Sequence, residues 1–231
     1  MEIFEGIIIA KNKYRDNSFI LTILNQAGTI SAKLLNTKSN RFNDAKYQIF
    51  NTVKVEMYKG PNKFYSIKDG VILRNIYYEK EDDFLFLGCI EFIKELYLKN
   101  IETYQDITYF KLLDITLSNM LTNGSLIKTL TFFMAYLLKI SGIFPTIDML
   151  HEVMKKLNCK EENNESKSCI LTAEATQLIN DFNKKRYNEN YSESVKKTTL
   201  VEILKCLIFF YEYYYNEKIV SKSLIFSIID N

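Results

Sequence analysis

The first third of the chain shows the short-period pattern of β-strands. Apolar and β-branched residues gather in short runs over residues 4–10, 19–24 and 28–35, which Asn, Asp and Gly separate. Val53, Val55 and Met57 alternate with more polar residues at period two, as in a strand with one buried face. A Gly-Pro-Asn turn then leads into a fifth run over residues 64–73. Five strands with one long polar connection, residues 36–47, favour a small closed barrel such as an OB-fold.

From about residue 80 the apolar positions recur at helical spacing instead. Stripes of this kind cover residues 85–96 and 110–120. Further helices are expected from Ser125 to Gly142, from Thr172 to Phe182 and over residues 195–215, with Ser125 and Thr172 as N-caps. The helix after Ser125 is apolar on several sides, so we expect it to be buried. The sequence therefore predicts an α+β chain, with an OB-fold over residues 1–78 and an all-helical domain over residues 79–231.

The tyrosine-rich run at residues 209–215 has two interpretations. One face of the last long helix, with Leu207, Tyr211 and Tyr214, is expected to pack in the core. Phe209 and Tyr213 point elsewhere on this helix and could form a groove for a partner. Core packing is the simpler explanation of the two.

Composition changes this picture mainly through charge. With 231 residues, 47% hydrophobic and 25% charged, the chain has ordinary globular usage, which excludes global disorder. Residues 1–80 hold 13 Lys and Arg against 7 Asp and Glu, a net charge of +6, and the other residues hold 17 against 21, a net charge of −4. A basic β-domain is thus fused to a mildly acidic helical domain.

The number and spacing of the histidine, glycine and cysteine residues argue against several kinds of chemistry. The chain has a single histidine, His151, and none of its 7 glycines forms a G-x-G-x-x-G or Walker A loop. His151, Cys159 and Cys169 match no standard zinc spacing. No nucleophile, base and orienting group can be assembled from so few candidates. We therefore expect a non-enzyme without cofactor or metal.

The sequence also bears on the compartment. The first residues lack a basic segment of a secretory signal, and no stretch offers the ~20 apolar residues of a membrane span. Cys89 and Cys206 lie in apolar helical surroundings, where reduced cysteines act as small hydrophobes. These features predict a cytoplasmic protein without disulfides.

Basic and aromatic residues are interleaved in the β-domain. Single-stranded nucleic acid requires this combination, because cations follow the phosphates and flat rings stack with bases. Alternatively, the lysines solvate the outer face of the barrel while the aromatics, namely Tyr14, Phe42, Tyr47, Tyr58 and Tyr65, fill its core, and Phe42 in particular could do so. Tyr14 and Tyr58 are the better stacking candidates. The candidate DNA-binding residues are Lys11, Lys13, Tyr14, Arg15, Lys33, Lys38, Arg41, Lys46, Tyr58 and Lys59.

Several segments, in order along the chain, resemble the RecO family of DNA-repair and recombination-mediator proteins. EGIII at residues 5–9 and YRDNSFILT at 14–22 are similar to the family's E-G-I-V-L and following I-L-T. VEMYKG at residues 55–60 and FYSIK at 64–68 resemble its L-E-L-Y-x-G and L-Y-x-L. YLLKISG at residues 136–142 and KSL at 222–224 resemble its L-L-x-L-x-G helix end and its C-terminal K-S-L-R-F.

This resemblance implies an OB-fold followed by a helical domain, without bond chemistry. RecO-like proteins bind single- and double-stranded DNA, anneal complementary strands, and act with RecR and the acidic C-terminal tail of single-strand-binding protein to load RecA. Many members carry a four-cysteine zinc module, but here the corresponding region has only Cys159 and Cys169, so we expect no zinc. The basic G-A-R stretch of the family is replaced by Leu34-Leu35-Asn36.

The leading hypothesis is a non-enzymatic DNA-binding mediator, with partner surfaces on the helical domain. Lys128 and Lys139 are candidate basic rim positions of a pocket for the acidic tail. An OB-fold module for RNA or tRNA with a helical docking domain is the main alternative. A protein-interaction scaffold and a latent hydrolase are further alternatives.

Overall fold

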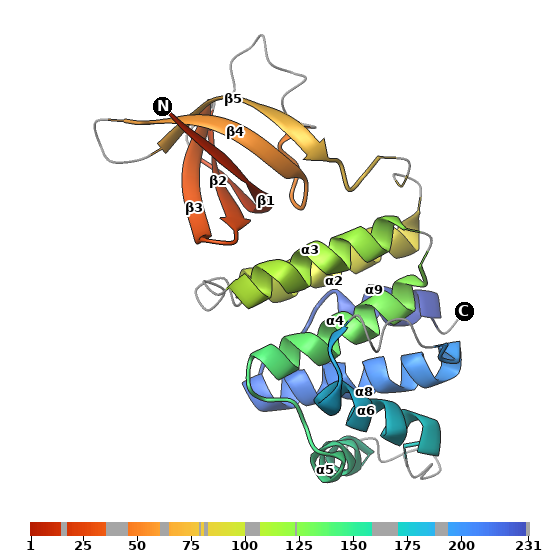
Figure 1. Cartoon of the computed structure of the whole chain (residues 1–231). Coiled ribbons are helices and arrows are strands. Elements are labelled where there is room, and N and C mark those ends of the chain that lie inside the picture. The colour runs from red at the N-terminus through yellow and green to blue at the C-terminus, as the bar shows by residue number, and fades with distance from the viewer. Residues whose placement is uncertain are drawn as a thin grey trace. The chain divides into compact units, whose positions relative to one another are not determined.

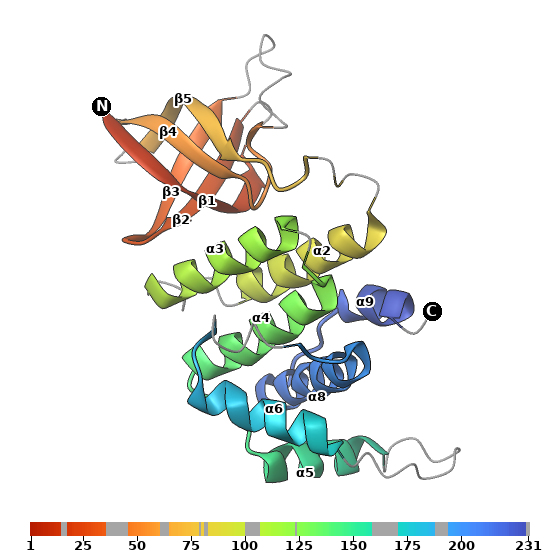
Figure 2. The same ribbon diagram turned by 45° about the vertical axis from the view of Figure 1, so that its right-hand side comes forward.

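The structure is a computed structural model that describes residues 1–14, 18–35, 46–60, 65–78, 80, 83–99, 107–122, 124–158, 171–187 and 194–229. Contacts divide the chain into two compact units, Met1–Leu121 and Thr122–Asn231. In the described part, the first unit holds five strands and two helices and the second unit five helices (Figures 1 and 2). The strands end at Arg74 and the first helix begins at Phe84, around the expected 78/79 boundary. The contacts nevertheless group the first two helices with the strands.

The five strands close into a barrel in the order β1-β2-β3-β5-β4, with β4 pairing back onto β1. All neighbours are antiparallel except β3 and β5, which are parallel. A five-stranded closed barrel of this kind is an OB-fold, so the expected fold class is confirmed. The strands are β1 (Glu2–Lys13), β2 (Ser18–Asn25), β3 (Gly28–Leu35), β4 (Thr52–Lys59) and β5 (Tyr65–Arg74).

The barrel core follows the period-two pattern of the sequence. Val53, Val55 and Met57 are fully buried inside the barrel, while Lys54 and Tyr58 between and after them are exposed. The side chains inside the barrel come from all five strands and from the segment before β4: Ile8, Leu21, Ile23, Ala32, Leu34, Tyr47, Val53, Val55, Met57 and Ile67. Alternation along each strand therefore fixes which side chains remain on the outer face.

Tyr47 packs into the barrel core beside Gly70 of β5. A Cβ atom on Gly70 would lie 2.9 Å from the Tyr47 hydroxyl oxygen and 2.9 Å from Cγ1 of Val55, so only glycine fits there. Burial, with a smaller contribution from Asp69, raises the pKa of Tyr47 to about 12. The neighbouring Lys46 donates from Nζ to the Gly70 carbonyl oxygen at 2.6 Å and pairs with Asp69 at 3.6 Å.

Helices α2 (Phe84–Lys99) and α3 (Ile107–Leu121) contact strands β1 and β2. Ile7 and Leu24 are partners in the β1–β2 register and are fully buried, although they do not belong to the cluster inside the barrel. Alternation places them on the outer face, because Ile8 and Ile23 beside them point inward. The ring of Phe50 meets that of Tyr97 on α2 edge to face, with centroids 6.5 Å apart. The helices thus bury this part of the outer face.

In the second unit, α4 (Leu126–Ile140) is buried along almost its whole length. Its N-cap is Ser125, as expected, whose Oγ accepts from the Lys128 amide. Thr131 donates from its hydroxyl to the carbonyl of Leu200 at 3.1 Å and so joins α4 to α8. The other helices are α5 (Ile147–Asn158), α6 (Ala173–Lys184), which Thr172 caps as expected, α8 (Lys197–Tyr215) and α9 (Lys222–Ile229).

The tyrosine-rich end of α8 is only partly core. Tyr211 is buried, but Tyr213 and Tyr214 are both more than half exposed, so the prediction of a core position for Tyr214 was wrong. Phe209 does not line an open groove, because its ring packs against Phe226 of α9 with centroids 6.0 Å apart. In the described part of the chain, no helix is both long and apolar enough to cross a membrane.

Candidate nucleic-acid interface

In the strand register, Lys33 of β3 lies between the β1–β2 pair on one side and the β4–β5 pair on the other. The pairing of Lys13 with Phe19 places the end of β1 beside the start of β2, and that of Lys59 with Tyr65 does the same for β4 and β5. Lys33, near the end of β3, pairs with Ser66 near the start of β5. OB-folds bind oligonucleotides with the β1–β2 and β4–β5 connections and the face of strands 2 and 3. We call this part of the barrel, defined by Lys11, Lys13, Tyr14, Phe19, Lys33, Tyr58, Lys59 and Tyr65, the basic face.

Lysines and aromatic rings are paired on the basic face. Three ammonium groups lie over rings, at distances to the ring centroid of 4.8 Å for Lys11 over Phe19, 5.4 Å for Lys33 over Tyr14 and 5.8 Å for Lys59 over Tyr65. Each pair joins neighbouring strands or a strand and a connection. Cation–π contacts at exposed sites contribute ~0.5–1 kcal/mol each, so they orient both the charges and the rings.

Tyr14 and Tyr58 lie on the outer face on either side of Lys33. Lys33 pairs with Ser66, and Ser66 pairs with Tyr58, so these three positions form a row across β3, β5 and β4. The Tyr14 ring reaches Lys33 from the end of β1. Tyr14 is 40% exposed and Tyr58 45% exposed, in contrast to the fully buried rings inside the first unit. The row therefore presents two accessible rings and a cation.

The basic face also includes a hydrogen bond to a carboxylate. The Tyr65 hydroxyl donates to Oε2 of Glu2 at 3.0 Å. This hydrogen bond raises the pKa of Tyr65 above its ordinary value. Glu2 thus holds the Tyr65 ring in place under the Lys59 ammonium.

Six of the sequence candidates belong to the basic face: Lys11, Lys13, Tyr14, Lys33, Tyr58 and Lys59. Lys46 is different, because its ammonium is engaged with Gly70 and Asp69. Arg15, Lys38 and Arg41 lie outside the described residues, as does Phe42. Tyr47 belongs to the core, as the alternative interpretation of the aromatics allowed.

Sequence reasoning missed Phe19 as a member of this surface. The signal was available, because a short connection between the two strands sets Phe19 opposite Lys13. Phe19 is partly buried against the barrel core and carries the Lys11 ammonium over its ring. It therefore packs on the barrel core and supports a cation at the surface.

The two lysines proposed on the helical domain have structural partners. Lys139 donates from Nζ to the carbonyl oxygens of Phe182, Asn183 and Lys185, at 2.6, 3.1 and 3.2 Å. An ammonium has three donors, and the α6 C-terminus takes all of them. Desolvation lowers the pKa of Lys139. Lys128 lies over the ring of Phe132, 5.9 Å from its centroid.

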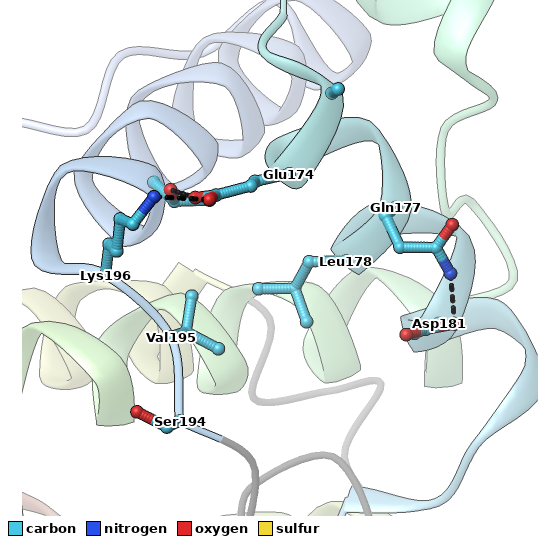
Figure 3. A pocket seen from close by; sticks show the side chains of 9 residues that line it. Glu174, Gln177, Leu178, Asp181, Ser194, Val195 and Lys196 are labelled. Carbon is cyan, nitrogen blue, oxygen red and sulfur yellow. Dashed lines mark hydrogen bonds and ion pairs between the residues drawn. The ribbon is translucent and has the colours of Figure 1, made fainter.

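A cavity of about 610 Å³ lies between α6 and the start of α8 (Figure 3). Leu178 and Val195 give it an apolar floor. At its rim, Glu174 accepts from Lys196 at 2.5 Å and from the Thr199 hydroxyl at 2.9 Å. These contacts tie α6 to α8, and the rim groups satisfy each other. We therefore assign this cavity no chemistry.

The described residues contain no cluster of three or more His, Cys, Asp or Glu side chains that could hold a metal ion. Cys159 and Cys169 lie outside those residues. His151 is exposed on α5. No protein-family model matches the chain, and no curated protein is significantly similar to it in sequence. The basic face of the barrel is therefore the feature of the described residues that bears most directly on function.

Proposed function

We propose that the protein is a non-enzymatic DNA-binding mediator of the RecO type, which acts in DNA repair and recombination in the cytoplasm. One observation carries this proposal: lysines and accessible tyrosines lie along the face with which OB-folds bind oligonucleotides. The net charge of +6 over residues 1–80 supports it. The resemblance of several segments to the RecO family points the same way.

Strand annealing follows from this surface by electrostatics. Two DNA strands repel each other through their phosphates, and bound lysines release the counterions and reduce this repulsion. Lys13, Lys33 and Lys59 supply such cations on the basic face. This action needs no bound nucleotide and no bond cleavage. A barrel with this surface can therefore hold a strand for pairing with its complement.

The helical unit is the proposed partner-binding part. RecO-like proteins act with RecR and with the acidic tail of single-strand-binding protein in loading RecA, and we extend these partners to this chain as part of the proposal. The exposed rings of Tyr213 and Tyr214 support a role in protein contacts, because exposed tyrosines are enriched at interfaces. Lys156 donates to the Tyr213 hydroxyl at 2.8 Å, so a cation accompanies these rings.

The proposal is tested by fluorescence anisotropy of a labelled single-stranded oligonucleotide over a series of salt concentrations. Each neutralised phosphate contributes about −0.7 to the slope of log K against log salt, so four to six contacts give roughly −3 to −4. Changing Lys13 to Ala should reduce the slope by about 0.7. Changing Lys46 to Ala should leave the slope unaltered, because Gly70 and Asp69 engage its ammonium.

Two results would contradict the proposal. A flat salt response, or no binding at physiological salt, would leave protein contacts as the function. Tighter binding of folded RNA than of DNA of the same length would favour the RNA-binding alternative. Annealing of complementary strands, followed by fluorescence quenching, is the second assay, and the Lys13→Ala variant should slow it.

A further inference from the structure

The row of Tyr14, Lys33 and Tyr58 has the chemistry to select one class of nucleic acid. We propose that it binds an unpaired strand through its bases: Tyr14 and Tyr58 each stack with a base, and Lys33 binds a phosphate of the backbone that connects these bases. The inference rests on the proposed DNA-binding function and specifies the substrate of the same surface. It makes the two tyrosines the residues that distinguish an unpaired strand from a duplex.

The spacing of the row supports this arrangement. The Lys33 ammonium lies 5.4 Å from the centroid of the Tyr14 ring. Tyr58 lies two strands away from Lys33, through Ser66, and neighbouring strands are about 4.8 Å apart. The cation thus sits between two rings on one continuous face. A nucleic-acid strand that runs from Tyr14, after β1, across β3 and β5 to β4 meets a ring, a cation and a ring in that order.

The accessibility of the rings separates them from the core aromatics. Tyr14 and Tyr58 are 40% and 45% exposed, whereas Tyr47 and Phe50 in the same unit are buried. A buried ring contributes to packing, but an exposed ring can offer its face to a base. The Ser18 hydroxyl donates to the carbonyl oxygen of Tyr14, which fixes the backbone that carries this ring.

A duplex cannot use these rings. Its bases stack on one another and present only edges in the grooves, so a duplex offers this surface phosphates alone. Stacking of an unpaired base on an aromatic side chain is worth about 5- to 150-fold in affinity. Loss of the two rings should therefore weaken binding of an unpaired strand and leave duplex binding almost unchanged.

The test compares three labelled probes of about 16 nucleotides, the upper site size of one OB-fold. They are a single strand, a duplex, and an abasic strand that keeps the sugar-phosphate backbone but has no bases. The variants of the full chain are Tyr14→Ala with Tyr58→Ala, and Lys33→Ala. Tyr78→Ala is the matched control, because Tyr78 is 69% exposed and lies outside the row. Circular dichroism checks that each variant is folded.

The double tyrosine variant should bind the single strand at least tenfold more weakly and the abasic strand and duplex as the unchanged protein does. Lys33→Ala should weaken binding of all three probes and lower the salt slope. Tyr58→Phe should keep the affinity, because the ring remains. Tyr78→Ala should change nothing.

Equal affinity of the unchanged protein for the single strand and the abasic strand would overturn the inference, because phosphate charge alone would then explain binding. The proposed DNA-binding function would survive that result. Absence of binding to all three probes at physiological salt would remove both. The two failures are therefore distinguishable in one experiment.

Discussion

Arg74, the last residue of β5, binds Asp114 on α3. Its Nη2 atom donates to Oδ1 of Asp114 at 2.8 Å, and its Nη1 atom donates to the Ser118 hydroxyl at 2.7 Å. The Arg74 side chain is only 20% exposed, so this ion pair is largely shielded from water. The contact joins the end of the barrel to a helix of the same unit.

Replacing Asp114 with Ala should destabilise the first unit by about 1.5–3 kcal/mol, the usual range for a hydrogen bond to a charged group, because Arg74 would keep a shielded charge without its partner. Urea unfolding measures this change in the free energy of unfolding. Asp148→Ala, at an exposed position on α5, is the control and should have little effect. Equal effects of the two substitutions would show that the ion pair contributes nothing.

Gly70→Ala should destabilise the barrel by about 1–3 kcal/mol, because the added methyl group overpacks the core against Tyr47 and Val55. Tyr47→Phe removes the hydroxyl oxygen that lies 2.9 Å from the new Cβ. The double variant should therefore recover part of the lost stability in thermal unfolding. If the two losses simply add, the proposed clash with the hydroxyl is not the cause.

The hydrophobic pattern of the sequence was sufficient to predict the buried side of the barrel strands, but it was not sufficient to predict which side chains of α8 are exposed. Period-two alternation at Val53, Val55 and Met57 identified their buried side correctly, because a strand has only two faces. On α8 the same reasoning misplaced Tyr214, because how far a neighbouring element covers a helix depends on residues distant in sequence. The extent of a helix's buried face is therefore a tertiary property.

Lys139→Met should lower the stability of the helical unit by about 1–3 kcal/mol, because three carbonyl groups at the end of α6 lose their donor. Lys128→Met keeps the apolar stem on the same helix and should cost much less. Urea unfolding of both variants, followed by circular dichroism, provides the comparison. An equal loss for both would argue against the capping role of Lys139.

Acid should weaken the contact between α6 and α8. Hydrogen bonds from Lys196 and Thr199 lower the pKa of Glu174 below its usual value of 4.5. Because this pKa is lowered in the folded state, the carboxylate stabilises the fold above that usual value and loses its contribution as the pH falls through the lowered pKa. Glu174→Gln should therefore shift the urea midpoint downward at pH 7, and the shift should shrink progressively as the pH falls below 4.5.

The control for this pH effect is the partner of Glu174. Lys196→Met removes the ammonium that lies 2.5 Å from the carboxylate. The double variant should be no less stable at pH 7 than the less stable single variant, because both changes break one contact. Full additivity would place the source of the acid sensitivity elsewhere.

Six residues of the candidate site could be named from the sequence, but not which of the basic residues have their charge engaged within the barrel. Lys33 and Lys46 look equivalent in the sequence, as basic residues near aromatic ones. The structure separates them, because Lys33 lies over Tyr14 and Lys46 reaches back to the carbonyl of Gly70. Lys46 and Gly70 are 24 residues apart in the sequence, so no local pattern predicts their contact.

The engagement of Lys46 with Gly70 has a consequence for association between molecules. In the described register, β3 pairs with β5 only at Tyr65 and Ser66, so the strand beyond them lacks this neighbour. Unpaired strand edges recruit extended chains, which is a route to aggregation. The Lys46 ammonium occupies the carbonyl of Gly70, and the Asp69 carboxylate accepts from its amide. At Gly70, an incoming strand therefore finds both backbone groups already taken, which disfavours its pairing at this position of β5.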